Sequence, residues 1–309
     1  MTTENIEPTE RTARMTVAVL GPGGIGGLLA ALLARAGHRV ICLAGDETAR
    51  TLNADGIRVR SGHFGDFTAR VEADTELREP VDACLIAVKA TALDAALKRV
   101  PAKSLGDALL VPFLNGVEHP AALRERYGPA RVAPAVIRVE STRVAPGVIE
   151  HGSPFAEIDL TGETVDRARL DELAAALNGA GPRTRVQDGE TVTLWAKMSF
   201  LAPLALLTTR YGLPLGDVRT LHRAELVALV EEAAAVSTAC GSPSDPATAL
   251  ARYDSFPPAT KSSMQRDAEA GRPLELDAIG GALLRAAGRY GVSVPVATGL
   301  VRELTAAGH

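Results

Sequence analysis

The chain has 309 residues, of which 46% are hydrophobic and 23% charged, and its formal net charge at pH 7 is -4. This length exceeds the size at which a single hydrophobic core usually stops growing, so about two domains are expected. A small negative charge without a basic cluster argues against a nucleic-acid partner and against an anionic membrane surface. Gly, Pro or a charge interrupts each apolar run, so we expect no membrane-spanning segment.

The first fourteen residues are polar, contain three glutamates and lack an apolar centre. They predict a floppy tail and no signal peptide. The three cysteines, Cys42, Cys84 and Cys240, are odd in number and show no paired spacing. This usage is typical of a reducing cytosol, so we expect a soluble cytoplasmic protein with cysteines as small core residues. The six histidines are scattered singly, so we expect no metal site.

A glycine-rich loop stands between a β-branched strand, residues 16–20, and an apolar helix, residues 28–36. Gly21, Gly23 and Gly26 form the Gly-x-Gly-x-x-Gly pattern: Gly21 permits a tight turn, Gly23 lets the backbone approach a pyrophosphate, and Gly26 allows close packing of helix and strand. Gly24 and Ile25 complete the loop, and the first amides of the helix are free to bind phosphate. The loop predicts a dinucleotide site.

The residues after the loop support this interpretation over an ordinary glycine turn. A second strand spans residues 39–44, and Asp46 stands about twenty residues beyond Gly26, where an acidic residue binds the ribose of a dinucleotide. Arg50 follows one helical turn later and is a candidate partner for a ribose phosphate. Asp46 and Arg50 therefore join the predicted cofactor site.

The same alternation continues to about residue 116. We expect a helix to residue 54, a hairpin over 57–71, a strand over 83–89 that ends in Lys89, a helix over 91–100, and a strand over 108–114 followed by Asn115. Polar residues at the carboxyl ends of buried parallel strands lie where doubly wound sheets bind ligands. The N-terminal half is thus predicted as an α/β, Rossmann-type doubly wound sheet.

The predicted secondary structure changes twice in the second half of the chain, first to extended segments and then to helices. Extended segments at 136–139, 148–151 and 157–160 are expected to complete the sheet as antiparallel strands, followed by a helix over 164–180 and a strand over 184–186. Beyond residue 188 we expect helices at 192–210, 221–240, 246–253, 274–290 and 295–306. The predicted organisation is a tail, 1–14, a dinucleotide-binding domain, 15–188, and an all-helical domain, 189–309, with a substrate cleft between the domains.

Two charged residues in the helical half are candidates for chemistry. Lys197 interrupts an apolar helix, and by itself this pattern favours a stem that covers the surface while its ammonium reaches water. Glu275 stands near the start of another apolar helix, where it would complement the helix dipole. Neither residue defines a catalytic site alone.

Together, these segments resemble the ketopantoate reductase (2-dehydropantoate 2-reductase) family from about residue 15 to the C-terminus. The resemblance is carried by the glycine loop, Val88-Lys89-Ala90, Leu114-Asn115-Gly116, Trp195-Ala196-Lys197, and Ser262-Ser263-Met264 followed by Glu275. It implies a Rossmann domain joined to a helical domain, with reduction of a 2-oxo acid by NADPH in the cleft. Long apolar helices hint at a homodimer.

The resemblance also implies a role for each matching residue. Lys197 matches the catalytic lysine and would act as general acid, while Glu275 matches a glutamate that assists catalysis. Asn115 would lie between nicotinamide and substrate, Lys89 would hold the cofactor, and Ser263 would bind the substrate carboxylate. An ammonium beside the carbonyl suits this chemistry, because hydride addition leaves negative charge on the oxygen.

The sequence departs from the family pattern at three substrate positions and near the ribose. Leu201, Ala205 and Thr260 stand where the pantoate-forming enzymes carry asparagines, so we expect ketopantoate to bind poorly and a bulkier or more apolar 2-oxo acid, or a related small carbonyl compound, to be preferred. Asp46 would repel a ribose phosphate that Arg50 would attract. The predicted cofactor is NADP, with NAD as the alternative.

Two other functions remain open on the sequence alone. One is an NAD-dependent hydroxy acid dehydrogenase that runs in the oxidative direction. The other is a non-catalytic nucleotide-binding redox sensor, which would need the glycine loop but no proton donor.

Overall fold

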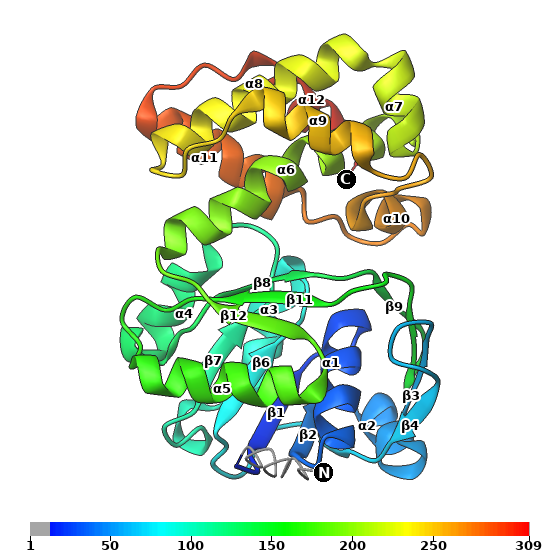
Figure 1. Ribbon diagram of the computed structural model, residues 1–309, viewed down its shortest axis with the longest axis vertical. Coiled ribbons are helices and arrows are strands. Elements are labelled where there is room, and N and C mark those ends of the chain that lie inside the picture. The colour runs from blue at the N-terminus through cyan, green and yellow to red at the C-terminus, as the bar shows by residue number, and fades with distance from the viewer. Residues whose placement is uncertain (1–12, 309) are drawn as a thin grey trace, which may run out of the picture.

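The computed structural model describes residues 13–308. An α/β part and a helical part lie one above the other in Figure 1. Five parallel strands form the main sheet in the order β5-β2-β1-β6-β7. Their bounds are β1 (Thr16–Leu20), β2 (Arg39–Leu43), β5 (Glu72–Asp74), β6 (Ala83–Ile86) and β7 (Leu109–Pro112). The predicted doubly wound sheet is confirmed.

The strand order fixes where a ligand can bind. From β1 the chain moves outward to β2 and β5, then returns to the other side of β1 for β6 and β7. The crevice between the carboxyl ends of β1 and β6 is therefore the switch point at which open α/β sheets bind ligands. The glycine loop follows β1 and opens α1 (Gly24–Arg35), and the loop after β6 contains Lys89.

The later strands do not complete this sheet, and that prediction is wrong. β9 (Ser141–Ala145) and β10 (Val148–His151) join β3 (Ile57–Ser61) and β4 (Phe67–Ala69) in a four-stranded sheet, because β10 pairs in parallel with β3. β8 (Ala135–Arg138), β11 (Glu157–Leu160) and β12 (Arg183–Val186) form a separate three-stranded sheet.

The connecting helices differ in part from the expected ranges. α2 (Asp46–Asp55) and α5 (Arg167–Ala180) lie where helices were predicted, and α4 (His119–Tyr127) was not predicted. Residues 90–99 form two 3-10 turns around the short α3 (Leu93–Ala96) instead of one helix. Carboxylates of the helical part contact the start of this region, Glu275 at the Ala90 amide and Asp267 at the preceding Lys89.

The C-terminal part is helical, as expected. It contains α6 (Glu190–Tyr211), α7 (Leu215–Leu221), α8 (Arg223–Ala239), α9 (Pro246–Ser255), α10 (Ser263–Glu269), a π-helical segment (Asp277–Gly281), α11 (Ala282–Tyr290) and α12 (Pro295–Ala306). The helix predicted at 221–240 begins instead at Arg223, since a break at His222 separates it from α7. The helix predicted at 274–290 starts as the π-helical segment.

α6 is the central helix of this part and packs against α8, α10 and α12. Contrary to the sequence prediction, it is long and apolar enough to cross a membrane, the only such helix within residues 13–308. In the protein, however, 56% of its apolar window is buried, so its length serves the core of the helical part. Lys197 lies near the middle of this helix.

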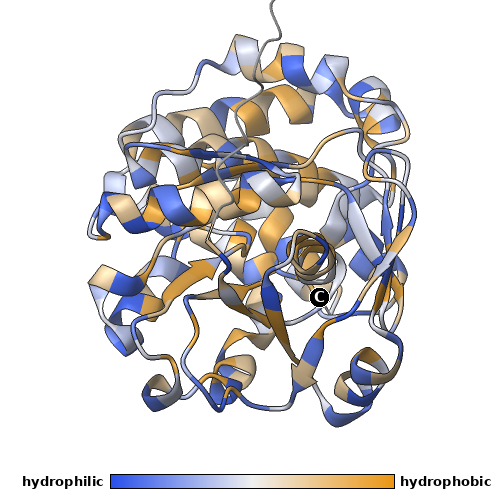
Figure 2. Cartoon of the chain, turned by 60° about the horizontal axis from the view of Figure 1, so that its bottom comes forward, coloured by the Kyte–Doolittle hydropathy of each residue, from blue (hydrophilic) through white to orange (hydrophobic). Residues whose placement is uncertain are grey.

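Hydrophobic residues concentrate on the strands and on the inward faces of the helices (Figure 2). Cys42 and Cys84 lie on β2 and β6 with no exposed area, and burial raises the pKa of each thiol to about 12. The prediction that these two cysteines are core residues is confirmed. The buried core thus fixes the positions of the strands, and the strands in turn position the loops at their ends.

Candidate active site

The glycine loop leaves room where a pyrophosphate would lie. Gly21 has φ +83° and donates its N–H to the Leu43 carbonyl at 3.2 Å, which sets the tight turn out of β1. A Cβ at Gly26 would lie 2.2 Å from the Gly21 oxygen, so helix and loop pack too closely for a side chain. A Cβ at Gly23 would meet nothing closer than that same oxygen at 4.0 Å. The loop is therefore closely packed at Gly26, and space is open next to Gly23.

The start of α1 offers free donors beside this space. No side chain caps the helix, and Gly24 and Ile25 supply its first amides. Such an uncapped N-terminus favours an anion, because the amides point outward and the helix dipole is positive there. The loop therefore fits the pyrophosphate of a dinucleotide.

Asp46 and Arg50 lie exposed on the first turns of α2, directly beyond the carboxyl end of β2. β2 neighbours β1, so α2 begins next to the glycine loop. Neither side chain is engaged in a hydrogen bond or an ion pair with residues 13–308. Both are available to a ribose or its phosphate.

Lys89 lies at the carboxyl end of β6 and forms an ion pair with Asp267 of α10. The Asp267 side chain is only 3% exposed, and its other oxygen accepts from Arg272 Nε at 2.9 Å. The Lys89 side chain is 42% exposed. The predicted cofactor lysine thus joins the two domains while part of it stays open to solvent.

Glu275 joins the same two domains from the helical side. Its Oε2 accepts from Asn115 Nδ2 at 3.0 Å, and its Oε1 accepts from the Ala90 amide at 2.9 Å. Glu275 is 5% exposed. Gly116, which follows Asn115 and has φ +91°, packs closely against the helical domain. A Cβ at Gly116 would lie 2.6 Å from the Ala278 carbonyl oxygen, so a side chain would not fit there. The structure therefore brings Asn115 and Glu275 together, at the ends of β7 and β6.

Lys197 lies within the electrostatic influence of Glu275 and lines a small cavity between the domains. The lining residues come from both parts: Leu114, Gly116 and Val136, and from α6 Leu194, Lys197, Met198 and Leu201. The ammonium of Lys197 has no hydrogen bond or ion pair within residues 13–308. Glu275 is bonded to Asn115 and Ala90 and not to Lys197, so it does not orient the lysine directly.

The pKa of Lys197 is lowered to about 8. Burial is the main cause, Glu275 opposes it, and Arg138 lowers the pKa further. A lysine in this range carries its proton near neutral pH and releases it readily, which suits a general acid.

Ser263 occupies the first turn of α10, exposed and without a hydrogen-bond partner within the described range. The hydroxyl of the neighbouring Ser262 already has two partners in the fold: its Oγ accepts from the Gln265 amide at 3.0 Å and forms a hydrogen bond with Thr208 Oγ1 at 2.8 Å. The Ser263 hydroxyl is thus the one of the two that is available to a substrate.

Of the three positions that depart from the family pattern, only Leu201 lines the cavity beside Lys197. Ala205 has no exposed area and packs in the helical core. The carbonyl of Thr260 accepts from the Leu215 amide at 2.8 Å, which fixes the loop before α10. The expectation of a more apolar pocket therefore depends on Leu201.

Two residues near Lys197, Arg138 and His119, were not predicted from the sequence. Arg138 ends β8, and its Nη1 donates to Asp159 Oδ2 at 2.6 Å; a cation at the end of an apolar strand is the signal that identified Lys89 and applies here too. His119 begins α4 and is 9% exposed, with no partner for either ring nitrogen within residues 13–308. Burial and then Lys197 lower its pKa to about 3, so it stays neutral. Nothing in the sequence around His119 indicates that its side chain is buried near Lys197.

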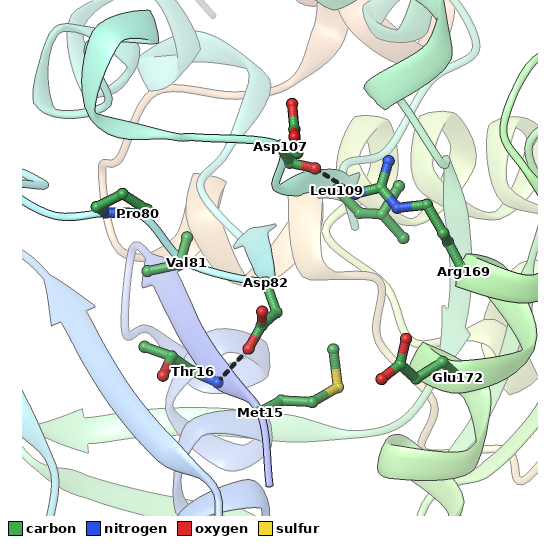
Figure 3. A pocket seen from close by; sticks show the side chains of 9 residues that line it. All are labelled: Met15, Thr16, Pro80, Val81, Asp82, Asp107, Leu109, Arg169 and Glu172. Atoms are coloured by element: carbon green, nitrogen blue, oxygen red, sulfur yellow. Dashed lines mark hydrogen bonds between the residues drawn. The ribbon is translucent and has the colours of Figure 1, made fainter. Parts of the chain in front are cut away.

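A larger hollow of about 310 Å³ lies elsewhere, at the amino ends of β1, β6 and β7. Figure 3 shows its lining, where Asp82 accepts from the Thr16 amide at 2.7 Å and Arg169 donates to the carbonyl of Asp107. Doubly wound sheets bind their ligands at the opposite, carboxyl edge. The candidate active site is therefore the smaller cavity around Lys197.

Comparison with known proteins agrees with this geometry. The family model described as ketopantoate reductase PanE/ApbA matches residues 17–160, and the model of its C-terminal part matches residues 191–307. The chain is 28% identical over 299 residues to a 2-dehydropantoate 2-reductase of Caulobacter vibrioides, covering 94% of this chain and 99% of that protein. It is 29% identical over 294 residues to the uncharacterized oxidoreductase YkpB of Bacillus subtilis, covering 91% and 95%.

A solved structure shows the same fold. The 2-dehydropantoate 2-reductase from Methylococcus capsulatus superposes with a TM-score of 0.85 at 27% identity, over 95% of this chain and 96% of that chain. The two family models together span both the glycine loop and the helices that carry Lys197 and Glu275. The chain belongs to the ketopantoate reductase family of oxidoreductases.

Proposed function

We propose that this protein reduces a 2-oxo acid with a nicotinamide cofactor and that Lys197 is the general acid. The observation that supports the proposal is that Lys197 lines a cavity between the domains, within the electrostatic influence of Glu275, which is bonded to Asn115. The family supports reduction of a small carbonyl compound. A redox sensor would not need such a proton donor.

Each residue has a distinct part in this mechanism. The bound cofactor supplies the hydride. The ammonium of Lys197 stabilises the charge that develops on the substrate oxygen and then delivers its proton there. Glu275 holds Asn115 and the loop after β6 in place, and Ser263 offers its hydroxyl to the substrate carboxylate. Lys89 faces the cofactor from the end of β6.

The cofactor fits the residues at the glycine loop. The open space at Gly23 and the free amides of α1 accept a pyrophosphate, and Arg50 offers a cation for a ribose phosphate. We infer that NADPH is the preferred cofactor because Arg50 can bind its ribose phosphate. The alternative is NADH, since the carboxylate of Asp46 would repel that phosphate. Fluorescence titration of both cofactors decides between them, and an NADH affinity higher than that for NADPH would overturn the preference.

We also propose a domain boundary near Asp188, which lies between β12 and α6. We further propose that the protein is cytoplasmic and forms a homodimer, as expected from the sequence. Light scattering on the purified protein measures the oligomeric state directly.

The function is tested by following NADPH and NADH absorbance with a panel of 2-oxo acids that includes ketopantoate and larger, more apolar members. The proposal expects turnover of at least one 2-oxo acid. A kcat/KM for oxidation of the matching hydroxy acids by NAD that exceeds kcat/KM for every 2-oxo acid would favour the oxidative direction in its place.

A pH profile tests the protonation state of Lys197. Since the protonated amine is the acid and its pKa is about 8, kcat/KM for reduction should be constant at lower pH and fall as the pH rises through about 8. The oxidative reaction should show the opposite trend, because there the neutral amine accepts the proton. An inflection near 10.5, the ordinary lysine value, would contradict the assigned environment.

Leu201→Asn tests the apolar wall of the cavity. Ketopantoate presents oxygen where Leu201 offers methyl groups, so the wild-type enzyme should reduce it poorly. The amide should raise kcat/KM for ketopantoate by about tenfold, the effect of one recovered hydrogen bond of about 1.5 kcal/mol. Ala205→Asn is the control, since Ala205 is buried in the helical core and should give no gain. Efficient reduction of ketopantoate by the wild type would refute the argument.

A further inference from the structure

One face of the three-stranded sheet carries a cation next to a residue that lines the cavity. Val136 of β8 lines the cavity with Lys197. Alternate residues of a strand share a face, so Arg138 points to the same side as Val136. Asp159 of β11 lies directly opposite Val136, and its carboxylate bonds Arg138 Nη1 at 2.6 Å. The remaining donors of Arg138 have no partner within residues 13–308.

A second cation packs against α6, the helix that carries Lys197. The guanidinium carbon of Arg252, on α9, lies 4.5 Å from the centroid of the Phe200 ring. Phe200 follows Lys197 by three residues on α6, so the two side chains lie on one side of the helix. The Arg252 residue is exposed, and its guanidinium has neither a hydrogen bond nor an ion pair with residues 13–308. The Phe200 ring holds this guanidinium one helical turn from Lys197 without using its N–H donors.

The ring itself is held firmly. Phe200 stacks on Tyr253 at 4.4 Å between centroids and lies 5.0 Å from Phe256. Tyr253 is fully buried and donates its hydroxyl proton to the Phe200 carbonyl. Arg252 therefore rests on a rigid aromatic surface, which reduces the conformational entropy that it would lose on binding a ligand.

The charges of this region are unbalanced. Burial is the main cause that lowers the pKa of both Lys197 and Arg252, and the charge of Arg138 lowers each further, so both of these cations lie within electrostatic reach of Arg138. The two nearby carboxylates are already bonded, Asp159 to Arg138 and Gln187, and Glu275 to Asn115 and Ala90. An anion that enters the cleft would relieve this repulsion.

We propose that Arg252, assisted by Arg138, binds the carboxylate of the substrate together with the Ser263 hydroxyl, while Leu201 and Met198 contact its apolar side group. A guanidinium binds a carboxylate through two parallel hydrogen bonds, and the free donors of Arg252 suit that geometry. This inference rests on the proposed function, since it takes the substrate to be a 2-oxo acid. It makes Arg252 a specificity residue that distinguishes acids from neutral ketones.

The test compares an acid with its neutral ester. Arg252→Met keeps the stem that covers Phe200 but removes the charge. With 3-methyl-2-oxobutanoate as substrate its KM should rise by about tenfold to a hundredfold, the range for a lost hydrogen bond to a charged group, while kcat changes far less. KM for the methyl ester should stay at the wild-type value. Arg252→Lys should recover part of the loss with the acid.

Arg289→Met is the matched control, because Arg289 is also exposed and without an ion pair but lies on α11 away from the cavity. It should alter neither KM. Equal losses with acid and ester in Arg252→Met, or no loss with either, would overturn the assignment while leaving the proposed function intact.

Binding of oxamate separates the two proposals if no 2-oxo acid is reduced. Calorimetry on the protein saturated with NADP should show oxamate binding to the wild type and its loss in Arg252→Met. That outcome would retain the carboxylate site while the proposed function fails. Equal oxamate affinity in both proteins, or no binding to either, would overturn the site.

Discussion

Lys197→Ala is expected to lower kcat for the reduction by about a hundredfold to ten-thousandfold, the usual contribution of a general acid. The reason is that no other protonated group lines the cavity: the remaining lining residues are Leu114, Gly116, Val136, Leu194, Met198 and Leu201. Cofactor affinity should stay near the wild-type value, since the glycine loop lies in the other domain. Steady-state absorbance gives kcat, and fluorescence titration gives the cofactor Kd.

Lys197→Met is the shape-matched variant for this experiment. It keeps the apolar stem and removes the buried ammonium, so it should be as inactive as Lys197→Ala and should not lower the melting temperature. Lys98→Ala, at an exposed position of the other domain, should keep full activity. Retention of wild-type kcat in Lys197→Met would remove Lys197 from the mechanism.

Gly23→Val is expected to abolish dinucleotide binding while the protein stays folded. The backbone of Gly23 has φ -81°, which valine adopts, and the nearest atom to a new Cβ is 4.0 Å away. The branched side chain would instead fill the space open to the pyrophosphate. Calorimetry with NADPH measures the affinity, and thermal unfolding measures the stability.

Gly26→Ala gives the contrasting result on the same loop. Its Cβ would lie 2.2 Å from the Gly21 oxygen and 3.0 Å from the Ala87 Cβ, so helix α1 must move off the sheet. The melting temperature should therefore fall in Gly26→Ala and not in Gly23→Val. Normal NADPH affinity in Gly23→Val would mean that the loop has a structural role only.

The parallel sheet was predictable because its signals are local. Each buried strand is a short apolar run, two of these runs are followed by a polar residue, Lys89 or Asn115, and their order implies a doubly wound fold. The later strands gave an equally clear local signal, but their partners are not encoded locally. β10 joins β3, about ninety residues away, and no pattern within either strand specifies that pairing.

The site was predictable only in part for the same reason. Lys197 and Glu275 emerged from a joint pattern, whereas each alone resembled an ordinary surface residue. The bond between Glu275 and Asn115 could not be read from spacing, because it depends on how the two domains dock. His119 and Arg252 gave no sequence signal, since an isolated histidine or an exposed arginine is common in any soluble helix.

The hydrogen bonds of Glu275 also bear on when the protein becomes active as it folds. Its partners Asn115 and Ala90 are 160 and 185 residues away in the sequence, and Lys89 and Asp267 are 178 apart. Contacts that close such long loops form late, because the entropy of loop closure is paid before the contact stabilises anything. Each core can assemble from its own segments, but the catalytic arrangement exists only after the halves have docked. Recovery of activity should therefore lag behind recovery of helical structure during refolding.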